Sequence, residues 1–82
     1  MNEITVLFFA TLRQHAGTKA LQLEVPVSMD VGALKQLLGH RYPNLESSLP
    51  TVLVSINREY AFDEAVIPLN AEVALFPPVS GG

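Results

Sequence analysis

The last seven residues of the 82-residue chain, FPPVSGG, are the stretch whose residue types and order most suggest chemistry. Gly81 and Gly82 have no Cβ, so a narrow channel can close around their backbone and leave a terminal carboxylate accessible. Pro77 and Pro78 fix φ and favour an extended backbone, which would project the residues after them away from a folded body. Terminal glycines add nothing to a core. Either these terminal residues have no function, or another protein binds them as a narrow extended tail. The proline pair before the glycines favours the second interpretation.

Other side chains offer little chemistry. The chain has no cysteine, which excludes disulfides, thiolate nucleophiles and cysteine-ligated metal. Its two histidines, His15 and His40, occur in no spacing typical of a metal or catalytic site, and we interpret them as surface residues. No metal site and no bound cofactor are expected.

Composition and charge limit the class of protein. Hydrophobic residues make up 49% and charged residues 16%, as in a globular domain, and the five basic residues are scattered, so no nucleic-acid partner is expected. The apolar run at 4–10 follows an acidic residue and is far shorter than the roughly 18 residues of a membrane span. We expect a cytoplasmic protein without a membrane partner.

Hydrophobic periodicity predicts one main helix and several strands. Helical spacing over 31–41, with Asp30 as the cap, predicts the helix, and 11–17 predicts one or two helical turns between Thr11, a possible N-cap, and Gly17. Strands are predicted at 4–10, 21–25, 52–57 and 72–76, and 58–62 predicts a turn and a short further strand. This order predicts an α+β roll, a mixed sheet of four to five strands with the helix packed on one face. Residues 1–77 form one domain in this interpretation, and 78–82 a flexible tail.

Strand alternation predicts both a core and a second apolar face. The predicted core is Val6, Phe8, Leu23, Leu34, Leu37, Leu38, Val54, Ile56 and Val73. One helix covers only one face of a sheet, so apolar residues remain on the open face. Loops 43–50 or 63–70 could cover them, or they could be scattered exposed residues. We favour a partner-binding patch of Leu7, Phe9, Phe76 and Tyr60.

Four stretches together resemble a known family. ITVLFFATLRQHAG, DVGALKQLL, VSIN and above all EVALFPPVSGG are similar to the ubiquitin-like sulfur carriers of β-grasp fold, and most to the MoaD family, the small subunits of molybdopterin synthase. The resemblance covers essentially the whole chain. Leu75 stands where the family often has a bulky aromatic residue, a change that a core tolerates.

The resemblance implies that Gly82 supplies the working carboxylate. An activating enzyme related to those of ubiquitin would use ATP to adenylate Gly82, and a sulfur donor protein would convert it to a thiocarboxylate. An ionised α-carboxyl, with a pKa of about 3.3 to 3.7, resists nucleophilic attack, whereas the acyl-adenylate has a good leaving group. Gly81 would let the tail thread the active site.

The same resemblance implies the partners. The thiocarboxylate would enter a pocket of the large subunit of a heterotetrameric synthase and donate sulfur to a cyclic pyranopterin precursor, building the molybdopterin dithiolene. This chain would be the non-catalytic, sulfur-donating subunit. Its expected partner-binding residues are those of the patch and the start of the tail: Leu7, Phe9, Tyr60, Phe76, Pro77, Pro78 and Val79.

Other functions remain open at this point. A carrier of the same class could serve thiamin thiazole synthesis or tRNA thiolation. The chain could instead be a ubiquitin-like modifier joined to lysines through Gly82, or a β-grasp binding module whose tail does nothing.

Overall fold

The computed structural model describes residues 1–78, so the predictions for Val79, Gly81 and Gly82 lie outside the described residues. The strands are β1 (Asn2–Phe8), β2 (Ala20–Val25), β3 (Leu53–Ile56), β4 (Glu59–Ala61) and β5 (Glu72–Phe76). The α-helices are α1 (Thr11–Ala16) and α2 (Val31–Arg41), and two short 3₁₀ helices, η1 (Pro43–Leu45) and η2 (Leu49–Thr51), follow α2.

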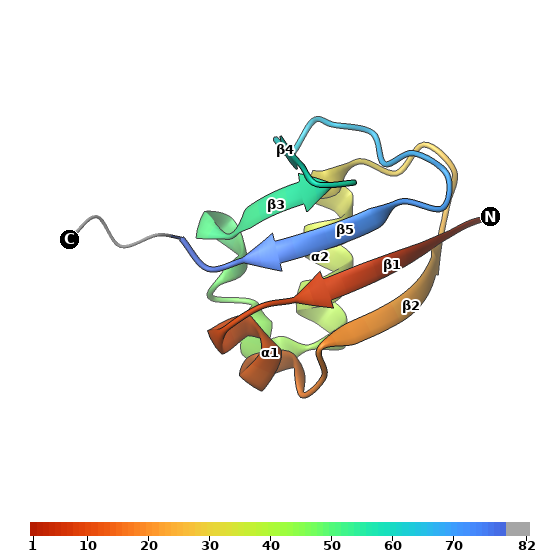
Figure 1. The fold of residues 1–82 in the computed structure, drawn as a ribbon. Coiled ribbons are helices and arrows are strands. Elements are labelled where there is room, and N and C mark those ends of the chain that lie inside the picture. The colour runs from red at the N-terminus through yellow and green to blue at the C-terminus, as the bar shows by residue number, and fades with distance from the viewer. Residues whose placement is uncertain (79–82) are drawn as a thin grey trace.

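The five strands form one mixed sheet in the order β2-β1-β5-β3-β4. Strand β5 is central, and its neighbour β1, from the opposite end of the described chain, runs parallel to it, while the other neighbours are antiparallel. Helix α2 crosses behind this sheet, and α1 lies at its edge beside the end of β1 (Figure 1). The predicted mixed sheet with one main helix is confirmed.

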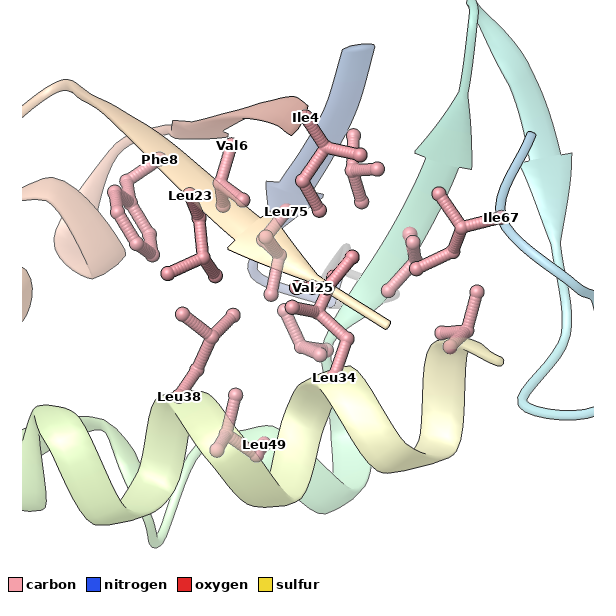
Figure 2. Packing of buried hydrophobic residues seen from close by; sticks show 14 of the residues in the cluster. Ile4, Val6, Phe8, Leu23, Val25, Leu34, Leu38, Leu49, Ile67 and Leu75 are labelled. Carbon is pink, nitrogen blue, oxygen red and sulfur yellow. The ribbon is translucent and has the colours of Figure 1, made fainter. Parts of the chain in front are cut away.

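Helix α2 has the bounds that its sequence predicts. The Asp30 side chain accepts a hydrogen bond of 2.8 Å from the Ala33 N–H, so it caps the first turn as expected. Leu34 and Leu38, four residues apart, point from α2 toward the sheet (Figure 2). This pair attaches the helix to the strands.

The end of β1 differs from its prediction. The strand stops at Phe8 and not at Ala10, because Ala10 has φ 54° and ψ −130°, a conformation that breaks the extended backbone. Thr11 is the first residue of α1 and not its N-cap, since Ala10 occupies that position without a capping side chain. Gly17 ends the helix at φ 76° in the left-handed region, as predicted.

Most of the predicted core is buried, but two of its predicted members, Leu37 and Ile56, are only partly buried and pack against it. Leu37 lies about 100° around the helix from Leu38, on the flank of the stripe that faces the sheet, and Ile56 is the last residue of β3, beside a hairpin turn. The side chains that fill the centre are shown in Figure 2.

The loops after α2 and β4 contribute to the core. Leu45 and Leu49 from the 3₁₀ segment and Ile67 from the loop before β5 are all buried in the same cluster as the strands. These loops therefore do not cover the open face, which settles one alternative left by the sequence. Among residues 1–78, no helix is long and apolar enough to cross a membrane.

Candidate functional site

The open face of the sheet carries a shallow hollow of about 470 Å³. Leu7, Phe9 and Phe76, predicted as partner-binding residues, line it and are each half-buried. Tyr60, also predicted, stands at its side with 78% of its surface exposed. The structure thus brings together the four side chains that the sequence assigned to one patch.

Strand register explains why these side chains meet. Leu7 pairs with Ala74, Ala74 pairs with Ser55, and Ser55 pairs with Tyr60, so one row of side chains crosses four strands. Side chains of paired residues share one face of a sheet. Since the small Ala74 and Ser55 lie between Leu7 and Tyr60, the middle of the row is hollow.

The rings of Phe9 and Phe76 stack beside this row, with centroids 4.6 Å apart and planes 13° from parallel. Two backbone hydrogen bonds hold Phe9 in place: its N–H donates to the Leu75 carbonyl (3.2 Å), and its carbonyl accepts from the Leu12 N–H (3.1 Å). The turn at Ala10 thus fixes Phe9 between β5 and α1. The preceding Phe8 points the other way and meets Tyr42 edge to face in the core.

A tight hairpin places Tyr60 at the rim. Asn57 and Arg58, with φ of 49° and 73°, form the two-residue turn between β3 and β4, where positive φ values are typical. Asn57 also anchors this hairpin to β5, because its N–H donates to the Glu72 carbonyl (2.8 Å) and its side-chain oxygen accepts from the Glu72 N–H (2.9 Å). Arg58 and Glu72 add opposite charges to the lining of the hollow.

The predicted tail begins at this face. Pro77 is half-buried and Pro78 exposed, directly after the strand that carries Phe76. Val79, Gly81 and Gly82 lie outside the described residues, so the structure does not test their roles. Five residues lie between Phe76 and Gly82, and the six backbone steps that join them span at most about 22 Å.

Sequence reasoning missed Leu53 and Ser55 as members of the open face, while alternation in the last strand had placed Ala74 there with Phe76. Leu53 is 37% exposed and pairs in register with Phe76, and Ser55 and Ala74 line the hollow. Alternation along 53–56 carries the signal, since buried Val54 implies that Leu53 and Ser55 face the other way.

The open face is suited to binding rather than to side-chain catalysis. Its residues are mainly apolar, and its buried hydroxyl, Ser55, has no histidine among the residues that line the hollow. His15 and His40 are exposed on α1 and α2. Within residues 1–78, no group of three or more acidic or histidine side chains could hold a metal ion.

Comparison with known sequences gives one consistent result. Residues 6–82 match the profile of the ThiS family. A molybdopterin synthase sulfur carrier subunit from Arabidopsis thaliana is 35% identical over 80 residues, covering 98% of this chain and 83% of the relative. One of the same description from Dictyostelium discoideum is 32% identical over 84 residues, covering 99% and 98%.

Solved structures agree on the fold. SAMP1 from Haloferax volcanii, also described as a small archaeal modifier protein, superposes with a TM-score of 0.86 at 30% identity, covering 99% of this chain and all of that one. A chain from the complex of subunits 1 and 2 of the Helicobacter pylori molybdopterin-converting factor gives 0.69 at 18% identity (98% and 99% covered), and a Caldiarchaeum subterraneum ubiquitin gives 0.65 at 16% (99% and 98%). The last two likenesses show the fold alone, which is the expected ubiquitin-like β-grasp.

Proposed function

The chain belongs to the ThiS family and, within it, to the MoaD-type molybdopterin synthase sulfur carriers, and we propose that it donates sulfur from a thiocarboxylate at Gly82 to a pterin precursor of molybdopterin. The observation that carries this proposal is an apolar face with the stacked Phe9 and Phe76, of which Phe76 ends the strand that leads directly into PPVSGG. A carrier needs both parts: a surface by which an enzyme holds it and a thin end that the enzyme can act on.

The proposed reaction has two steps at one carboxyl group. A carboxylate oxygen of Gly82 attacks the α-phosphate of ATP, releasing pyrophosphate and forming the acyl-adenylate. The outer sulfur of a persulfide on a donor protein then displaces AMP from the acyl carbon and forms an acyl disulfide. A second thiol attacks the donor's sulfur, forms a disulfide with it, and releases the thiocarboxylate with the electron pair of the broken S–S bond. Both steps take place in the active site of the activating enzyme, so this chain contributes the reacting group and the docking face.

The second subunit of the synthase is the proposed recipient. The complex described for the Helicobacter pylori molybdopterin-converting factor supports a pairing of this kind, through a protein of the same fold. The open face here would be covered by that subunit, with the tail reaching into its active site and the pterin-binding residues on the partner. We place this exchange in the cytoplasm and in a heterotetramer of two small and two large subunits.

A second candidate function is a protein modifier. The observation in its favour is the likeness to SAMP1, which is named a small archaeal modifier protein. A modifier would use the same acyl-adenylate but transfer Gly82 to a lysine amine, forming an isopeptide bond. Both functions share activation and differ in the nucleophile that follows.

Mass spectrometry separates the two candidates. The full chain is incubated with its activating enzyme, ATP and a sulfur source, and the C-terminal peptide is weighed. Replacement of one oxygen by sulfur, confined to Gly82 and dependent on ATP, supports the carrier. Isopeptide conjugates without any thiocarboxylate support the modifier, and no modification by an activating enzyme that is competent on another carrier excludes both.

A further inference from the structure

A second hollow of about 520 Å³ lies beside the first, at the β4 edge of the sheet. Leu53, Tyr60 and Phe62 are among the side chains that line it. The other apolar lining residues are Pro50, Val52, Val54 and Ala61. Tyr60 lines both hollows. The apolar surface therefore continues from Phe9 and Phe76 past Tyr60 to Phe62.

Phe62 is the most exposed of the large apolar side chains reported for the described residues, at 83%. It follows β4 directly, and one further step of the β3–β4 register places it opposite Leu53. Leu53 pairs with Phe76, which stacks on Phe9. Four large apolar residues thus follow one line across four strands, whereas a solitary exposed phenylalanine would need no explanation.

The hollow beside Phe62 is lined by seven apolar or aromatic side chains and by three charged ones, Lys35, Asp63 and Glu64. Two of its charged side chains, Lys35 and Asp63, already form an ion pair with a nitrogen–oxygen distance of 2.8 Å. Tyr60 and Leu53 belong to the open face, whereas Ala61 and its partner Val54 face the core, so this hollow lies around the β4 edge. The chemistry that fits is an aliphatic or aromatic side chain of a protein partner.

The residues of the first hollow alone offer too little exposed apolar area for a stable complex. A specific interface buries about 800 Å² on each partner. Leu7, Phe9 and Phe76 are already half-buried within the domain, and even a fully exposed aromatic side chain contributes only about 150–250 Å². Exposed apolar area that adjoins the first hollow lies at Tyr60 and Phe62.

We infer, on the basis of the proposed function, that the second subunit of the synthase covers both hollows and inserts an apolar side chain beside Phe62. Phe62 is then a binding residue at the far end of the interface from the tail. Contacts at both ends of the line from Phe9 to Phe62 fix the rotation of the domain on its partner, whereas a single anchor leaves it free to turn. The direction in which the tail approaches the partner depends on that rotation.

The test measures the affinity of the full-length chain for the purified second subunit of the same organism by titration calorimetry. Phe62→Ala should bind at least tenfold more weakly than the unaltered chain with an unchanged melting temperature, because the removed ring is exposed in the free domain. Phe62→Leu, which keeps an apolar side chain, should regain most of the affinity. Leu69→Ala is the matched control, since Leu69 is 62% exposed and lines neither hollow.

Each outcome has one meaning. Loss of affinity in Phe62→Ala but not in Leu69→Ala supports the inference. A change below threefold in Phe62→Ala, or an equal loss in both variants, overturns it, while strong binding by the unaltered chain leaves the proposed function standing. If the unaltered chain does not bind the second subunit, the proposed function itself fails.

Discussion

Phe9, directly after β1, and Phe76, the last residue of β5, stack face to face, although one residue comes from the beginning of the chain and the other from near its end. The stack lies on the open face, where it adds nothing to the packing between sheet and helix. Neighbouring Phe8 and Leu75 fill the core on the other side. The stacked pair is thus available to a partner without loss to the fold.

Replacing Phe9 with aspartate should weaken binding to the second synthase subunit and to the activating enzyme by more than about 2 kcal/mol, because a charge would be buried in both interfaces. Surface plasmon resonance with each partner measures the effect, and circular dichroism checks the fold. Val27→Asp is the control, at a residue that is 58% exposed and outside the face. Unchanged affinity for both partners would show that the open face is not the docking surface.

Deleting Gly82, or adding one residue after it, should abolish sulfur transfer while leaving thermal stability unchanged. The buried cluster lies between residues 4 and 75, so neither change removes a core contact. Thiocarboxylate formation is followed by mass spectrometry and stability by calorimetry. Gly81→Ala should still bind both partners but react about a hundredfold more slowly, because a small displacement of a reacting group costs about that much. Normal transfer by the deletion variant would exclude Gly82 as the reacting residue.

Leu38→Ala should lower the free energy of unfolding by about 2 to 5 kcal/mol, because Leu38 is fully buried between α2 and the sheet. Leu37→Ala should cost less than half as much, since Leu37 is only partly buried. Urea denaturation of both variants measures the difference. Equal losses would contradict the structure, in which Leu38 is fully buried and Leu37 only partly buried.

Asn2→Ala should destabilise the domain by about 1 to 3 kcal/mol, because Asn2 is a buried polar residue that joins β1 to the loop before β5. Its side-chain nitrogen donates to the Pro68 carbonyl (3.0 Å), and its oxygen accepts from the Asn70 N–H (2.8 Å). Hydrogen exchange should accelerate at the Asn70 amide before other sites. Asn44→Ala, at an exposed residue, should change neither the free energy of unfolding nor the exchange rate at Asn70. Slow exchange at the Asn70 amide in the Asn2 variant would contradict the proposed role of Asn2.

Elements with strong periodicity could be predicted from the sequence, and elements set by single backbone conformations could not. The bounds of α2 and β5 are those predicted, because a capped stripe of leucines and an alternating strand ended by prolines are local signals. The end of β1 depends on a positive φ at Ala10, and nothing about alanine indicates that conformation. Leu45 and Leu49 come from a segment without regular periodicity, so their burial depends on tertiary packing.

The residues of the candidate site could likewise be predicted from the sequence only in part. Alternation in β1 and β5 predicted that Leu7, Phe9 and Phe76 share a face, and the structure brings them together with Tyr60. Phe62 was missed because it follows the end of a three-residue strand, where the register with β3 decides its neighbour and no sequence pattern gives that register.

The central position of β5 bears on how the protein is made. On the ribosome, the β1–β2 hairpin and α2 emerge first, but β1 reaches β3 only through β5, which is synthesised last of the strands. Pairing between segments so distant in sequence is slow and must wait for the whole chain. A nascent or truncated polypeptide lacking 72–76 cannot bring Phe9 and Tyr60 onto one surface. Under the proposed function, such unfinished chains would present no complete surface to the activating enzyme, and the topology would restrict activation to chains in which β5 is in place.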